Sequence, residues 1–167
     1  MHDWRRQMRK RHVKYDEGQW FAVPLRSGGY VLGLIVRGSY RTRGGLGYFF
    51  GPRFDNIPHG MLTFSLRSVD AILIAWFGDL EIIEGRWPLI DNTQPFSRSD
   101  WPVPKFSRRD ALDPSMGWLV EYDQDVQGFD VVQGIRCRAA EIVGLPQDGV
   151  WGAGAIETQL TKLLSGV

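Results

Sequence analysis

The side chains of this chain whose types and spacing best suit binding or catalysis are acidic, and they lie between positions 121 and 130. Glu121, Asp123 and Asp125 place a carboxylate at alternate positions, and Asp130 follows closely. The spacing does not match a calcium-binding loop, because the glycine and the terminal glutamate of such a loop fall at the wrong offsets. The segment is therefore either a polar hairpin loop or an electronegative surface that contacts a basic partner.

Side chains suited to catalysis are few and lie far apart in the sequence. His2, His12 and His59 form no pair at the spacing of a metal-binding helix, and none belongs to a nucleophile motif. Cys137 is the single cysteine, so the chain forms no internal disulfide and no thiolate zinc site. We therefore predict a binding protein rather than an enzyme. A hydrolase whose site assembles in space from His59, a carboxylate and a serine stays an alternative.

The net charge of +1 hides an uneven distribution of charge along the chain. Residues 1–78 carry 12 Lys and Arg against 5 Asp and Glu, whereas residues 79–167 carry 8 against 14. Such polarity can steer charged partners towards one face of a protein. Residues 1–14 are basic and are either a solvated terminus or a contact for an anionic partner. No run approaches the ~20 apolar residues that span a bilayer, which predicts a soluble, cytoplasmic protein.

A β-hairpin is predicted near the start of the chain. Two runs rich in aromatic and β-branched residues, Trp20–Leu25 and Tyr30–Val36, flank a four-residue break that contains Gly28 and Gly29. Glycine adopts positive φ without steric cost, as a tight hairpin turn requires. The hairpin carries no catalytic side chain, so we expect it to form part of the scaffold.

Other segments predict further strands and one helix. The very apolar run Asp70–Phe77 is typical of a central strand, and Leu80–Ile90 begins with the alternation of a half-buried strand. Ser39–Gly47 is rich in glycine and arginine and predicts a loop. Ala155–Leu164 repeats isoleucine and leucine at helical spacing, and Gly166 follows, which indicates an amphipathic helix.

The fold expected from these elements is α+β and predominantly β. Short strands are also predicted at Val103–Phe106, Trp118–Asp123 and Phe129–Arg138. The strands would form an antiparallel, strongly twisted sheet or a partly open barrel, with the amphipathic helix at the C-terminus. We expect a single domain over residues 15–167, preceded by a basic arm at residues 1–14.

Four segments in order along the chain carry a recognisable pattern: Glu17–Leu25, Gly29–Val36, Gly85–Ile90 and Gly152–Leu160. Together they resemble the immunity protein 26 family of bacterial polymorphic toxin systems. The first two are similar to the family's opening strand and its continuation, the third resembles its G-x-W-x-x-I segment, and the fourth resembles the start of its terminal helix. The resemblance implies a predominantly β protein that binds a cognate toxin in the cytoplasm of the producing cell and blocks it stoichiometrically. It implies no cofactor and no catalytic residues.

The matched residues suit strand packing and turns, so the toxin contacts must be sought among exposed charges and aromatic rings. We predict contacts from four acidic residues and one aromatic anchor: Glu121, Asp123, Asp125, Asp130 and Trp101.

A different hypothesis is a small β-barrel that binds nucleic acid. It would use the basic residues of Arg5–Lys14 and Arg37–Arg43 together with nearby aromatic rings. It predicts salt-dependent binding to short single strands, which toxin neutralisation does not require.

Overall fold

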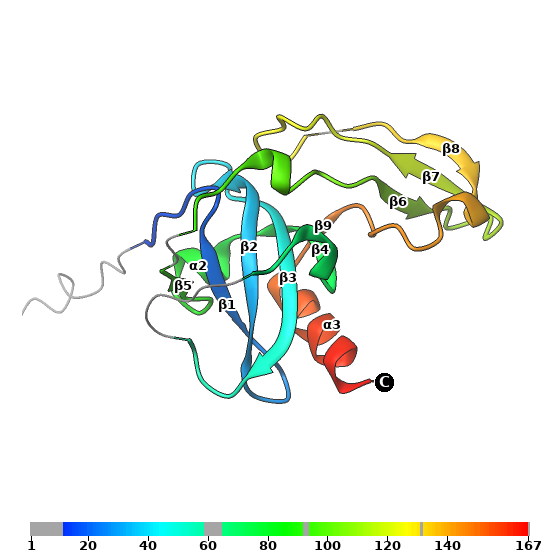
Figure 1. The fold of residues 1–167 in the computed structure, drawn as a ribbon. Helices are drawn as coiled ribbons and strands as arrows, with labels where there is room; N and C mark the ends of the chain where they lie inside the picture. Colours follow the sequence, from blue (N-terminus) through cyan, green and yellow to red (C-terminus); the bar gives the residue numbers. More distant parts are fainter. Residues whose placement is uncertain (1–11, 59–64, 92–93, 131, 167) are drawn as a thin grey trace, which may run out of the picture.

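The largest element of the computed structural model is a six-stranded open sheet (Figure 1). The structure describes residues 12–58, 65–91, 94–130 and 132–166. The strands lie in the order β5-β1-β2-β3-β4-β9, and every neighbouring pair is antiparallel except β4 and β9. Their bounds are β1 Trp20–Pro24, β2 Tyr30–Ser39, β3 Gly44–Phe54, β4 Leu73–Gly78, β5 Leu89–Ile90 and β9 Val150–Trp151.

A second, three-stranded antiparallel sheet extends away from the first (Figure 1). It has the order β6-β7-β8 and consists of β6 Phe106–Arg109, β7 Met116–Val120 and β8 Ile135–Arg138. The helical elements are α2 Leu80–Ile83, α3 Ala153–Ser165 and the 3₁₀ turns η1 Ser68–Asp70, η2 Arg98–Asp100 and η3 Ala139–Ile142. These elements confirm the predicted α+β, predominantly β fold with a C-terminal helix, and the large sheet stays open rather than closing into a barrel.

The predicted hairpin is formed by β1 and β2. The register pairs Trp20 with Leu34 and Pro24 with Tyr30. The turn between the strands contains Gly28 at φ 93° and Gly29 at φ 77°, a backbone conformation that side chains with a Cβ rarely adopt. The paired glycines therefore set the turn.

Two clusters of buried side chains cover the two faces of the large sheet. One cluster contains Phe21, Phe49 and Phe77 and is closed by Ile156 and Leu160 of α3. The predicted amphipathic helix is thus confirmed, and it ends at Gly166, whose φ is 71°. The other cluster joins the two sheets through a shared set of residues, including Trp20, Leu34, Phe50, Trp76, Trp101, Phe106, Val120 and Val126.

The segment predicted as a half-buried strand over Leu80–Ile90 is mostly not a strand. Its first residues form α2, because the Asp79 carbonyl accepts hydrogen bonds from Ile82 N at 2.9 Å and Ile83 N at 3.0 Å. Only Leu89–Ile90 pairs in the sheet. A run as short as Leu-Glu-Ile-Ile-Glu fits the helical period as well as the strand period, and burial of Ile82 favours the helix here.

Other predicted boundaries also move. Half of the predicted loop Ser39–Gly47 belongs to β3, which begins at Gly44. Glycine is needed there, since a Cβ on Gly45 would lie 1.9 Å from the Arg37 carbonyl oxygen across the strand pair. The three strands of the small sheet begin or end up to several residues away from their predicted limits. Among the described residues, no helix is long and apolar enough to cross a membrane.

Gly33 offers a direct test of the packing between β1 and β2. A Cβ at Gly33 would lie 2.4 Å from Cζ of Phe21, a ring that stacks on Trp87 at a centroid distance of 5.8 Å. We expect Gly33→Ala to lower the free energy of unfolding by about 1–3 kcal/mol, measured by urea denaturation. Gly78→Ala is the matched control, because its Cβ would meet no described atom within 4 Å. Equal midpoints for the two variants would contradict the packing described.

Candidate interaction surface

A buried arginine connects the large sheet to two loops. Arg37 lies near the end of β2 and has no exposed surface. The register between β2 and β3 shifts between Ile35 and Arg37, and an irregularity of this kind redirects the side chains that follow it. The Arg37 side chain reaches the loops that contain Trp101 and Gln124.

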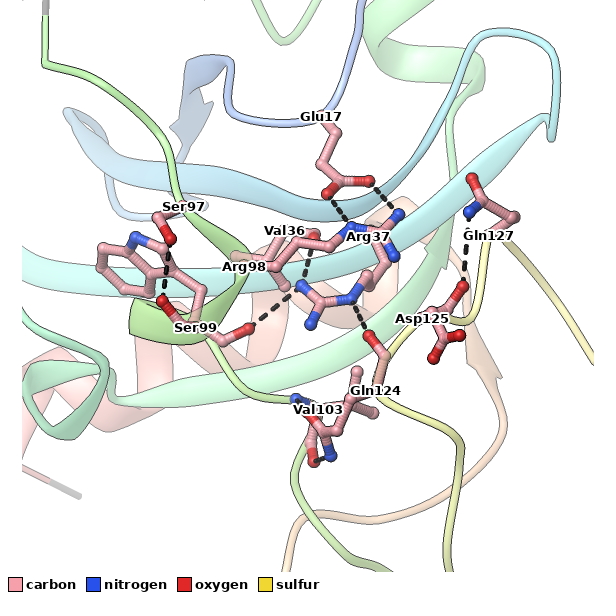
Figure 2. Close-up of polar contacts among 11 residues, drawn as sticks. Glu17, Val36, Arg37, Ser97, Arg98, Ser99, Val103, Gln124, Asp125 and Gln127 are labelled. Atoms are coloured by element: carbon pink, nitrogen blue, oxygen red, sulfur yellow. Dashed lines mark hydrogen bonds and ion pairs between the residues drawn. The ribbon is translucent and has the colours of Figure 1, made fainter.

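Arg37 donates hydrogen bonds to three main-chain carbonyl groups (Figure 2). Its Nη1 donates to Val36 O at 2.6 Å and to Trp101 O at 3.0 Å, and its Nε donates to Gln124 O at 2.9 Å. Burial, followed by the positive charge of Arg98, lowers the pKa of the Arg37 guanidinium. These three hydrogen bonds offset part of the cost of burying the charge, and through two of them the guanidinium fastens both loops to the sheet.

A bidentate ion pair holds the first of these loops from the other side. Arg98 Nε lies 2.5 Å from Glu17 Oε1, and Arg98 Nη2 lies 2.8 Å from Glu17 Oε2 (Figure 2). The hydrogen bond to Glu17 raises the pKa of Arg98. The pair is partly buried, with 31% and 22% of the two side chains exposed. It ties the segment before β1 to η2, next to Trp101.

The acidic segment between β7 and β8 is held by its intervening residues. The Gln124 side chain forms two hydrogen bonds with the Val103 main chain, from Nε2 to O at 2.9 Å and from Val103 N to Oε1 at 2.8 Å. Tyr122 donates its hydroxyl to Asp148 Oδ1 at 2.6 Å, and Val126 is buried. Burial and this hydrogen bond raise the pKa of Tyr122. The segment is therefore anchored at residues 122, 124 and 126.

The four predicted acidic contact residues are all exposed on this anchored segment. Glu121 lies 3.5 Å from Lys105, and more than half of each side chain is exposed. Asp125 borders a pocket of about 460 Å³ that Arg37, Arg98 and Gln124 also line. Asp125 thus lies beside the Arg37 hydrogen bonds, and Asp123 precedes Gln124 on the same segment. Asp130 lies farther along, after the buried Gly128.

Trp101, the predicted aromatic anchor, lies in the core rather than on the surface. Only 8% of the residue is exposed. Its ring makes edge contacts with Trp20, Tyr48 and Phe50 at centroid distances of 6.2, 5.5 and 5.8 Å. Trp101 directly follows the turn η2, and this loop is held against the sheet by the hydrogen bond from Arg37 to the Trp101 carbonyl and by the Arg98–Glu17 ion pair. These contacts account for the burial.

The residues of the alternative nucleic-acid surface are placed only in part. Arg37 is buried, so it is removed from that surface, whereas Arg41 and Arg43 are exposed. Most of the basic arm and His59 lie outside the described residues. Within the described ranges, no group of three or more His, Cys, Asp or Glu side chains is arranged to hold a metal ion.

The contacts of this surface that sequence patterns miss are the hydrogen bonds made by Arg37 and Gln124. An arginine in a strand normally indicates a solvent-exposed position, and two of the three acceptors of Arg37 lie 64 and 87 positions away along the chain. The only local signal is that Arg37 directly follows the apolar run Tyr30–Val36. That run shows no alternation of polar and apolar residues that would place Arg37 on an exposed face of the strand.

The fold and this surface define a small, mainly β scaffold that holds an acidic loop in a fixed position. The sequence profile of the immunity protein 26 family matches residues 16–118, and the chain belongs to this family. The matched region includes Glu17, Arg37 and Arg98 but ends before the acidic segment. No curated protein and no solved structure gives a significant match.

Proposed function

We propose that this protein binds a cognate bacterial toxin in the cytoplasm of the cell that makes it, and neutralises it by stoichiometric association. Membership of the immunity protein 26 family supports this role and favours a non-enzymatic one. The toxin would be occluded at its active site or at another surface it needs. Specific interfaces of this type bury about 1,600 Å² in total.

The observation that carries the proposal is the anchoring of Gln124 between two exposed aspartates. Its main-chain carbonyl accepts a hydrogen bond from Arg37, and its side chain forms hydrogen bonds with both the main-chain N–H and the carbonyl of Val103. Asp123 and Asp125 are therefore presented by a loop that is already ordered. Ordering a contact segment before binding reduces the entropy lost on association. Carboxylates held in this way suit a basic toxin surface.

Co-expression with the toxin encoded beside this gene tests the proposal directly. We expect cells that produce both proteins to grow, and the two purified proteins to co-elute as a complex on gel filtration. Cells that die as they do with the toxin alone, together with separate elution of the two proteins, would refute it.

The acidic loop should mainly set the rate of association. We expect Asp123→Asn with Asp125→Asn to lower the association rate constant by roughly tenfold at low salt, because exposed charges steer encounters. The difference should shrink at high salt, where exposed charges are screened. Stopped-flow fluorescence measures the association rate constant at low and at high salt.

Asp55→Asn is the matched control for the acidic loop. Its side chain is 82% exposed and pairs with Arg53 at 2.7 Å, just after β3. We expect it to associate at the wild-type rate. Equal rates for the loop variant and for this control would exclude the acidic segment as the steering surface.

A further inference from the structure

Three side chains form a row across the small sheet. Arg108 on β6 is paired with Trp118 on β7, and Trp118 is paired with Arg136 on β8. Directly paired residues of antiparallel strands project to the same face. The row is called here the arginine–tryptophan ladder. It does not belong to the acidic segment, although β7 leads directly into Glu121.

The two guanidinium groups lie against the tryptophan ring. The Arg136 Cζ is 5.4 Å and the Arg108 Cζ is 5.9 Å from the ring centroid, distances at which a cation is attracted to an indole. The ring is thus flanked by cations from both neighbouring strands. A nucleic-acid base would have to displace them in order to stack.

Nearly buried carboxylates fix the positions of both arginines. Arg136 Nη1 lies 2.9 Å from Asp110, and Arg108 Nε lies 3.6 Å from Asp148. The side chains of Asp110 and Asp148 are only 11% and 10% exposed, whereas those of Arg136 and Arg108 are 50% and 44% exposed. The carboxylates therefore lie behind the guanidinium groups, and half of each arginine remains open to solvent.

The surroundings of the ladder also suit a protein partner. An open pocket of about 900 Å³ lies beside it, lined in part by Arg108, Trp118 and Val143. Val143 is 80% exposed. Clusters of arginine, tryptophan and exposed apolar side chains are typical of the residues that dominate protein interfaces.

We propose that the arginine–tryptophan ladder is a second contact patch for the same toxin, and that it receives carboxylate side chains of the toxin. This inference rests on the proposed function. A guanidinium binds a carboxylate through two parallel hydrogen bonds, and both groups are held in place before binding. A phosphate backbone suits this region less, because the four exposed acidic residues follow on the adjacent segment and repel a polyanion.

The two patches together require a toxin surface with charges of both signs. A basic region would face the segment from Glu121 to Asp130, and an acidic region would face the ladder. Such an arrangement fixes the orientation of the complex and discriminates against toxins with a uniformly basic surface.

The experiment compares the affinities of variants for the toxin domain encoded beside this gene, measured by isothermal titration calorimetry. We expect Arg108→Gln with Arg136→Gln to weaken binding by roughly tenfold or more. Arg136→Lys should give an intermediate loss, since it keeps the charge but not the paired donors, and it preserves folding if the double variant does not fold. Arg53→Gln is the control, because Arg53 is 45% exposed and lies in an ion pair on β3.

The outcomes distinguish a failure of the inference about the ladder from a failure of the proposed function. Wild-type neutralisation combined with unchanged affinity of both ladder variants would leave the ladder a structural feature of the sheet and overturn this inference alone. Absence of wild-type binding would overturn the proposed function, and the inference with it. Salt-sensitive binding of a fluorescent single-stranded oligouridine that the ladder variants lose would assign the ladder to nucleic acid instead.

Discussion

Replacement of Arg37 by methionine is expected to lower the free energy of unfolding by about 3 kcal/mol or more. The change leaves the carbonyl groups of Val36, Trp101 and Gln124 without the donor that now binds them. Each hydrogen bond to a charged group is typically worth about 1.5–3 kcal/mol. Methionine fills most of the vacated volume, so the loss reports on hydrogen bonding more than on packing. Urea denaturation followed by tryptophan fluorescence gives the value.

The Arg37 variant should also loosen the acidic loop before the whole protein unfolds. We expect faster amide hydrogen exchange at residues 122–126, because Gln124 then keeps only its side-chain hydrogen bonds to Val103. Arg109→Met, which removes an exposed arginine from β6, should change stability by less than about 0.5 kcal/mol. A wild-type urea midpoint for Arg37→Met would show that Arg37 does not hold the two loops.

Local patterns were enough to predict the hairpin and the terminal helix. Gly28 and Gly29 mark a turn that other residues rarely adopt, and Ile156 and Leu160 repeat on one face of the helix. Signals of this kind depend on neighbours in the sequence, and backbone sterics make them reliable. The segment Leu80–Ile83 carries no comparable signal, since its few residues fit either period, and tertiary contacts decide its conformation.

The position of Arg37 could not be predicted, because its environment is made by residues far away in the sequence. The same limitation applies to the arginine–tryptophan ladder. Arg108, Trp118 and Arg136 lie on three strands, and only the register of those strands shows that they share a face. The exposure of Asp123 and Asp125 was easier to anticipate, since charged side chains are seldom fully buried without a partner. The anchoring of Gln124 between them could not be predicted, because its hydrogen-bond partners are distant in the sequence.

The family match and the charged surfaces are distributed differently along the chain. The match covers residues 16–118, which contain Arg37, two of its three hydrogen-bond acceptors and most of the large sheet. The acidic segment and Arg136 come after it. This division agrees with the proposed function, in which the matched region supplies a scaffold that holds the loops, and most of the proposed partner contacts follow that region in the sequence.

Truncation of Trp101 to alanine is expected to lower the free energy of unfolding by about 3–5 kcal/mol. The ring fills the space between Trp20, Tyr48 and Phe50, and its removal leaves a cavity where the core joins the two sheets. Trp101→Phe keeps an aromatic ring in that space and should cost less than half as much. Urea denaturation of the two variants, with unfolding followed by far-ultraviolet circular dichroism, measures both values.

Toxin affinity distinguishes a core role for Trp101 from a role as an aromatic anchor. Since 92% of the residue is shielded within the protein (8% exposed), we expect Trp101→Phe to bind the toxin as tightly as the wild type under conditions where both are folded. An anchor would behave differently, because loss of an interface tryptophan typically weakens binding by 2 kcal/mol or about thirtyfold. A loss of that size, with stability nearly unchanged, would mean that the loop after η2 opens on binding and exposes the indole. The Arg37 hydrogen bond to the Trp101 carbonyl opposes such opening, so Arg37→Met would then increase toxin affinity rather than reduce it.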